Sequence, residues 1–137
     1  MPSDTAYHIL VADAQESFRD AIRHVIRESF ADTLLTEAES LEGTLFAMEH
    51  EPDVDLVLLD LNMHDMKGLE GLYRVRLQAP RIRVVMVSET DDRDTVLEGV
   101  KMGSAGYINK TADHEQIREA LQAIVAGQVY LPSGLLQ

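Results

Sequence analysis

The sequence contains no cysteine, and this absence excludes both disulfide bonds and thiolate metal sites. It is also poor in basic residues, because 12 Lys and Arg face 24 Asp and Glu and give a formal net charge of −12. Proteins bind nucleic acid phosphates largely through Lys and Arg that displace counterions. The charge therefore argues against nucleic acid as a direct ligand. Most of the acidic excess is expected on a solvated surface, and some of it around a cation.

The sequence also lacks the segments that direct a protein to a membrane. No apolar run approaches the length of a membrane span, and the amino terminus lacks the basic and apolar regions of a signal peptide. We therefore expect a cytoplasmic protein with no membrane contact. No glycine-rich phosphate loop occurs, so nucleotide binding is unsupported. The 137 residues suffice for one domain with its own core.

Four short, largely apolar runs each lead into a single polar residue. They are His8–Ala12 before Asp13, Leu56–Leu59 before Asp60, Ile82–Val87 before Ser88, and Gly106–Asn109 before Lys110. Runs of this length without alternation of apolar and polar residues are typical of strands buried on both faces of a parallel sheet.

Helical patterns separate these runs along the chain. The predicted strands are His8–Ala12, Leu34–Ala38, Val54–Asp60, Val84–Ser88 and Ala105–Ile108. The predicted helices are Gln15–Phe30, a helix capped by Ser40 that ends at Pro52, Leu69–Gln78, a helix from Asp91 or Asp92 to Gly103, and one from Ala112–Asp113 to Gly127. The remainder, Gln128–Gln137, is predicted to be irregular. Alternating strands and helices predict an α/β doubly wound parallel sheet, with the strand order 2-1-3-4-5.

The carboxyl ends of the strands form the expected binding crevice of such a sheet. Asp60 is a candidate nucleophile towards a phosphoryl group. Asp13 is expected beside it, and the two carboxylates suit Mg²⁺, together with the backbone carbonyl of Asn62. Lys110 supplies a point charge for phosphate, and Ser88 a hydroxyl.

In this order and spacing the segments resemble the receiver domain of two-component response regulators, which has the flavodoxin-like fold. The matching segments are Ile9–Asp13, Phe18–Asp20, Val57–Met63, Gly68, Val84–Ser88 and Gly103–Lys110. The resemblance implies an N-terminal tail over residues 1–7, a receiver domain over 8–127, and the start of a linker over 128–137. Residues 124–132 resemble the exit from the fifth helix in the LuxR/NarL-type subfamily. In that subfamily a helix-turn-helix output domain follows, and we expect one to be missing here.

The resemblance also implies a role for each site residue. Asp60 would accept phosphate from a histidine kinase with Mg²⁺, while Ser88 and Lys110 would bind the phosphoryl oxygens. Tyr107 would be the aromatic that turns inward on activation. Such a domain is a switch and not a turnover enzyme. It would contact DNA only through the missing domain, and would form a homodimer through helix 4, strand 5 and helix 5, or through helices 1 and 5.

The sequence departs from the receiver pattern at several positions. Ala14 stands where receivers carry a second acid that binds magnesium, so we predict weak Mg²⁺ binding. Glu89 stands where a small residue is usual, and His64 and Thr111 where proline is common. These departures leave open an alternative, an atypical receiver that acts as a phosphorylation-independent dimerisation or protein-interaction module. A phosphohydrolase is disfavoured, because Asn62 stands where such enzymes need a second acid for proton transfer.

Overall fold

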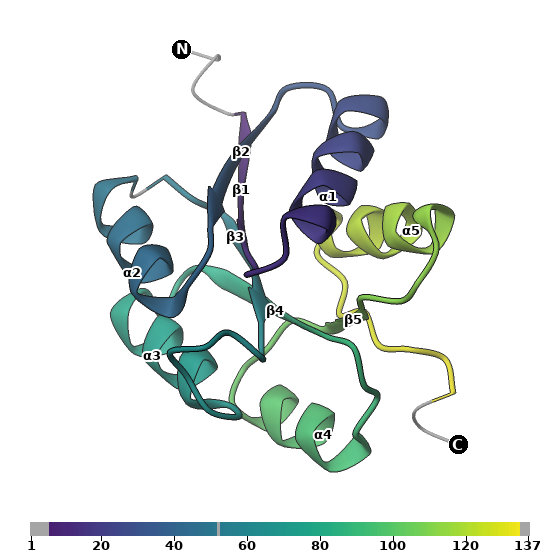
Figure 1. Cartoon of the computed structure of the whole chain (residues 1–137). Coiled ribbons are helices and arrows are strands. Elements are labelled where there is room, and N and C mark those ends of the chain that lie inside the picture. Colours follow the sequence, from purple (N-terminus) through teal and green to yellow (C-terminus); the bar gives the residue numbers. More distant parts are fainter. Residues whose placement is uncertain (1–5, 52, 135–137) are drawn as a thin grey trace.

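A computed structural model describes residues 6–51 and 53–134 of the chain (Figure 1). Its five strands form one parallel sheet in the order β2-β1-β3-β4-β5, and five helices alternate with them. The strands are β1 (Tyr7–Ala12), β2 (Thr33–Ala38), β3 (Leu56–Asp60), β4 (Arg83–Ser88) and β5 (Tyr107–Asn109). The helices are α1 (Glu16–Ser29), α2 (Leu41–His50), α3 (Glu70–Gln78), α4 (Arg93–Lys101) and α5 (His114–Val125). The predicted fold class and strand order are confirmed.

Two cores lie on opposite faces of the sheet, because successive residues of a strand point to opposite sides. On one face, α1 and α5 cover the side chains of Ile9, Val11 and Leu58. On the other face, α2, α3 and α4 cover Leu10 and Leu59. Each fully buried aliphatic side chain contributes about 1.5–3 kcal/mol to folding. The strands in between are therefore apolar on both sides, as the unbroken runs predicted.

Helix starts follow the predicted capping residues. The Ser40 hydroxyl accepts a hydrogen bond from the Gly43 N–H at 3.0 Å at the start of α2. At the start of α5, Asp113 and Gln116 form a reciprocal capping box. Asp92 occupies the N-cap position of α4, where its side chain bonds Thr95 instead of the helix backbone. These ends were predictable because a cap is a local device. Within the described residues no helix is long and apolar enough to cross a membrane.

The strand starts differ from the predictions by one residue for β1, β2 and β4, which begin at Tyr7, Thr33 and Arg83, and by two residues for β3 and β5. β3 begins at Leu56 instead of Val54. Val54 is buried, but its N–H donates to the Glu51 carbonyl in a turn and not to a neighbouring strand. β5 begins at Tyr107 instead of Ala105 and continues to Asn109. Tyr7 already belongs to β1, and predictions for residues 1–5, 52 and 135–137 lie outside the described residues.

The segment after α5 is less irregular than predicted. Gly127 turns the chain with a φ of +95°. Tyr130 then forms a parallel bridge with Gly106, in which its carbonyl accepts the Tyr107 N–H at 2.9 Å and its N–H bonds the Ala105 carbonyl at 3.3 Å. Residues 128–134 therefore lie against the free edge of β5.

Candidate functional site

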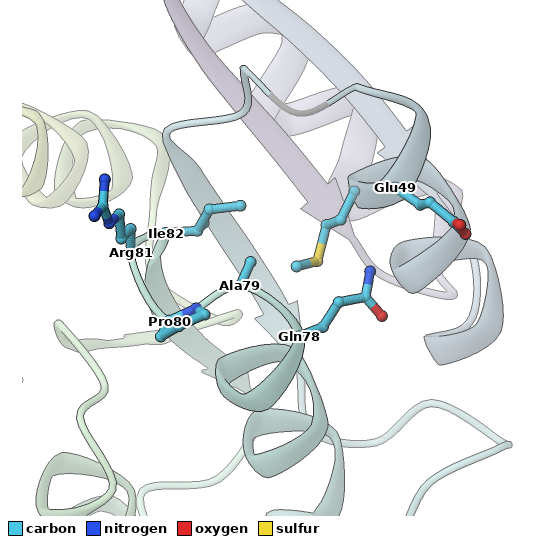
Figure 2. Close-up of a pocket in the computed structure, with 7 residues that line it drawn as sticks. Glu49, Gln78, Ala79, Pro80, Arg81 and Ile82 are labelled. Atoms are coloured by element: carbon cyan, nitrogen blue, oxygen red, sulfur yellow. The ribbon is translucent and has the colours of Figure 1, made fainter.

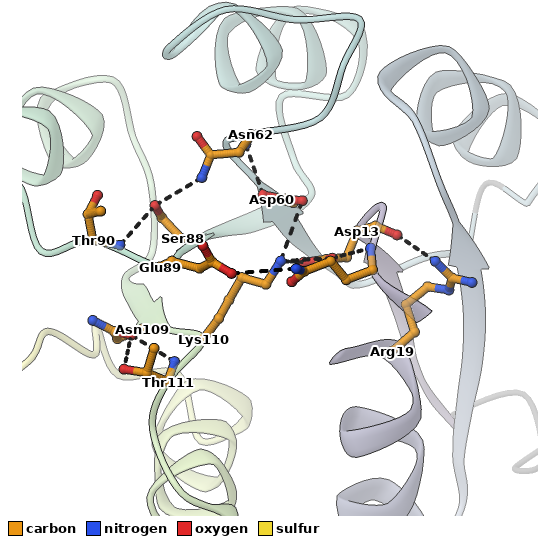
Figure 3. A network of polar contacts seen from close by, with 11 residues as sticks. Asp13, Arg19, Asp60, Asn62, Ser88, Glu89, Thr90, Asn109, Lys110 and Thr111 are labelled. Carbon is orange, nitrogen blue, oxygen red and sulfur yellow. Dashed lines mark hydrogen bonds and ion pairs between the residues drawn. The ribbon is translucent and has the colours of Figure 1, made fainter. Parts of the chain in front are cut away.

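The sheet register brings the predicted polar residues together at one edge (Figure 3). The pairing of β1 with β3 and of β3 with β4 places Asp13 and Ser88 on either side of Asp60. Lys110 follows β5, and its backbone N–H donates to the Ser88 carbonyl at 2.8 Å. The four side chains therefore lie at the carboxyl ends of four strands: Asp60 and Ser88 end β3 and β4, while Asp13 and Lys110 follow β1 and β5.

Lys110 joins the two carboxylates. Its Nζ lies 2.9 Å from each carboxylate oxygen of Asp13 and 3.7 Å from Oδ2 of Asp60. All three side chains are buried, with exposures of 6% for Lys110, 1% for Asp13 and 3% for Asp60. The ammonium also lies 5.4 Å from the centre of the Phe18 ring, which favours a cation. The charged groups of this buried cluster thus carry two negative charges and one positive charge.

Asp13 keeps an unused lone pair. Burial raises its pKa, and the charge of Asp60 also raises it, against the lowering effects of the Gln15 N–H and of Lys110. The Gln15 N–H donates to Oδ1 at 2.8 Å, while Oδ2 receives no hydrogen bond and has only the ion pair with Lys110. A buried oxygen without a donor is costly, so this site favours an additional cation.

Asp60 and Ser88 are tied together by the loop after β3. The Asn62 N–H donates to Oδ1 of Asp60 at 2.8 Å, and its side-chain amide donates to the Ser88 hydroxyl at 3.2 Å. The Thr90 N–H also approaches the Ser88 hydroxyl oxygen, at 3.4 Å. Since these contacts use the hydroxyl oxygen as an acceptor, the hydroxyl proton remains available to a phosphoryl oxygen.

The donor set fits one small hard cation. Asp13 and Asp60 provide carboxylate oxygens and the Asn62 loop provides a backbone carbonyl, which are ligands typical of Mg²⁺. No group of three His, Cys, Asp or Glu suited to a metal occurs between residues 6 and 134 with residue 52 set aside. Ala14, which is exposed in the loop after β1, offers no ligand atom from its side chain.

A family model of the response regulator receiver domain matches residues 9–122. The chain belongs to this family. Receiver domains generally bind Mg²⁺ at their phosphorylation site, and they act in signalling and not as turnover enzymes. The polar residues described above therefore lie within a receiver domain.

Relatives and solved structures agree with this assignment. The receiver domain is 40% identical over 131 residues to the glycerol metabolism activator of Pseudomonas putida, covering 96% of this chain and 59% of that protein. It is 32% identical over 127 residues to the nitrate/nitrite response regulator protein NarL of Escherichia coli strain K12, covering 93% and 58%. A LuxR family DNA-binding response regulator from Silicibacter pomeroyi has the same fold, with a TM-score of 0.81, 23% identity, and coverage of 94% and 98%. The chain thus spans about three fifths of the length of these curated relatives.

Tyr107 of the receiver domain lies inside the fold, with 1% of its surface exposed. Burial raises its pKa, while the nearby hydroxyls of Ser88 and Thr90 lower it. Its hydroxyl is buried but forms no hydrogen bond of acceptable geometry. The sequence-based expectation was a ring that turns inward on activation. In this structure the ring already occupies the inward position.

Two residues that support the site were missed from the sequence. Arg19 is buried and donates from Nη1 to the Asp13 carbonyl at 2.7 Å and from Nε to Glu37 at 3.0 Å, which fixes the loop after β1. Phe18 packs beneath the Lys110 ammonium. A signal for Arg19 was present, since it is a charged residue within the apolar stripe of α1.

A pocket of about 600 Å³ lies away from the Asp60 site, between the end of α2 and the loop that leads from α3 into β4 (Figure 2). Its lining combines one carboxylate, Glu49, and one guanidinium, Arg81, with uncharged residues. This set lacks the paired carboxylates and the buried ammonium of the Asp60 site, so we assign it no chemistry.

Proposed function

We propose that this receiver domain accepts a phosphoryl group on Asp60 from the phosphohistidine of a histidine kinase. Oδ1 of Asp60 is held by the Asn62 N–H, which leaves Oδ2 as the attacking oxygen. An oxygen–phosphorus bond forms at Oδ2, the nitrogen–phosphorus bond of the donor breaks, and the imidazole leaves with the electron pair and takes up a proton. Lys110 and Ser88 then contact the phosphoryl oxygens.

One observation carries this proposal: the Lys110 ammonium lies between two buried carboxylates, 3.7 Å from the attacking oxygen. A buried ammonium that can move from Asp13 towards a new anion stabilises the charge that develops on the phosphoryl group. Ser88 ends β4, the strand paired with β3, so its hydroxyl would contact the same group from that side.

Asp13, Asp60 and the Asn62 backbone carbonyl would hold Mg²⁺. The ion would neutralise charge on the phosphoryl oxygens during transfer. We propose that it binds more weakly than in receivers with two acids after β1, because Ala14 offers no carboxylate. Replacing Ala14 with Asp is expected to tighten binding, and a calorimetric titration without such a gain would count against this explanation.

The phosphoacceptor assignment is tested by intact-protein mass spectrometry. After incubation with a small phosphodonor and excess Mg²⁺, the wild-type chain is expected to gain one phosphoryl group. Asp60→Asn is expected to gain none, while Asp65→Asn, a nearby exposed acid, serves as the matched control and keeps the adduct. An adduct that persists in Asp60→Asn would contradict the assignment.

The length of the relatives suggests what the switch controls. We propose that phosphorylation regulates a separate helix-turn-helix domain, since the curated relatives are longer than this chain and several are named as transcriptional regulatory proteins. Homodimerisation through α4, β5 and α5, or through α1 and α5, would transmit the change.

A second candidate function is a phosphorylation-independent interaction module. Ala14 favours it, and so does Glu89, whose Oε2 accepts a long hydrogen bond of 3.5 Å from the Gln15 amide across the site entrance. If this reading is correct, dimerisation measured by sedimentation will be the same for the wild type and for Asp60→Asn, and no adduct will form.

A further inference from the structure

Gln15 connects the two sides of the site entrance. Its backbone N–H donates to Oδ1 of Asp13 at 2.8 Å, and its side-chain amide contacts Oε2 of Glu89 at 3.5 Å. A single residue therefore touches both a buried carboxylate of the site and an exposed one from the loop after β4. Gln15, Glu89 and Lys110 also line the same groove of about 350 Å³. Figure 3 shows Glu89 beside Lys110, with Asp60 and Asp13 nearby.

The charges at this entrance are unbalanced. Among the described residues, Lys110 supplies the ammonium that pairs with both Asp13 and Asp60, so the addition of Glu89 gives three carboxylates to one ammonium. Oδ2 of Asp13 receives no hydrogen bond although it is buried. A buried oxygen whose only contact is the ion pair with Lys110, and an excess of negative charge, both favour a divalent cation over a further side-chain contact.

Glu89 also has the freedom that a ligand needs. It directly follows Ser88, which fixes its backbone at the carboxyl end of β4, while its side chain is exposed. A hydrogen bond of 3.5 Å is at the limit of the accepted range, so breaking it costs little. The methyl side chain of Ala14 carries no ligand atom for a cation.

From this geometry we propose that Glu89 supplies the third carboxylate of the divalent cation site, in place of the acid that is absent at position 14. The proposal rests on the proposed phosphoacceptor function, since it concerns the same site. The Gln15 amide holds the Glu89 carboxylate across the entrance until the cation takes it. An acid from the loop after β4 would thus replace the missing carboxylate of the loop after β1.

Isothermal titration with Mg²⁺ at constant ionic strength tests the proposal. Glu89→Gln is expected to weaken binding by roughly tenfold or more, the loss typical when a group supporting a metal site is removed. Glu16→Gln removes the same charge from an exposed residue at the start of α1 and is the matched control, with an expected change below about twofold because exposed charges are screened. In the double variant, Ala14→Asp is expected to restore the affinity that Glu89→Gln loses.

Carbon-13 NMR of side-chain carboxylates gives a second readout that does not depend on activity. The Glu89 carboxylate resonance is expected to shift on addition of Mg²⁺, and the Glu16 resonance is not. Equal affinities of Glu89→Gln and Glu16→Gln, tighter binding in Glu89→Gln, or an unshifted Glu89 resonance would each overturn the proposal.

The phosphoacceptor function is judged separately by the mass of the intact wild-type protein after phosphodonor treatment at saturating Mg²⁺. If an adduct forms while Mg²⁺ affinity is independent of Glu89, this inference fails and the function stands. If affinity depends on Glu89 and no adduct forms, the metal ligand stands and the function fails.

Discussion

At Asp13, burial raises the pKa of the carboxyl group, while the Gln15 N–H and the Lys110 ammonium lower it. The raised pKa means that the folded environment disfavours the ionised carboxylate, because it is buried and lies beside Asp60, even though Lys110 contacts it. For an acid whose pKa is higher in the folded state than in the unfolded state, the native state loses stability as the pH rises through the folded value. Without a bound cation, the ionised Asp13 carboxylate therefore lowers the stability of the native state.

Replacing Asp13 with Asn is accordingly expected to raise the melting temperature of the metal-free protein at neutral pH. A gain of about 1 kcal/mol would correspond to roughly 2–8 °C for a domain of this size. The gain should shrink as the pH falls towards 3.8, the ordinary pKa of the group, because wild-type Asp13 then becomes protonated. Thermal melts over this range, with and without Mg²⁺, measure the effect. A metal-free Asn variant that melts below the wild type at pH 7.5 would contradict the argument.

β5 connects the site to the segment after α5. Lys110 follows the strand at its carboxyl end, and the N–H of Tyr107 at its amino end donates to the Tyr130 carbonyl at 2.9 Å. A displacement of Lys110 or Tyr107 would therefore reach residues 128–134 through a strand of three residues. Such short, two-ended elements are suited to transmit a local change of charge.

The contact between β5 and Tyr130 depends on a glycine. A Cβ added to Gly106 would lie 2.5 Å from the Tyr130 carbonyl oxygen. We expect Gly106→Ala to release residues 128–134, at a cost of about 1–3 kcal/mol, and to speed amide hydrogen exchange at Tyr107. Gly127→Ala is the matched control, because Gly127 also has a positive φ but has open space around it. Slow exchange at Tyr107 in Gly106→Ala would show that the segment is held by other contacts.

Local features of the helices and strands could be predicted from the sequence, whereas contacts between distant segments could not. Helix caps such as Ser40 and Asp113, and the polar residues that end the strands, were predictable because they follow from local patterns and from the geometry of parallel sheets. The pairing of Tyr130 with Gly106 was not, since it joins residues distant in sequence through backbone atoms. The Gln15–Glu89 contact was not predictable either, because it depends on side-chain conformations.

Over the whole molecule, the acidic charge opposes direct contact with DNA. The chain carries a formal net charge of −12, with 24 acidic residues against 12 basic ones. Repulsion between acidic domains and phosphates opposes association at low salt, where electrostatic attraction would otherwise be strongest. Phosphorylation adds further negative charge and increases this repulsion.

We therefore expect this chain alone to show no specific binding to duplex DNA, whether or not Asp60 is phosphorylated. Fluorescence anisotropy with a labelled duplex, at salt concentrations from low to physiological, measures this directly. A cationic DNA-binding protein serves as the positive control for the duplex. Tight binding that weakens steeply with added salt would require a basic surface that outweighs the 24 acidic residues, and would contradict the assignment of DNA recognition to a separate domain.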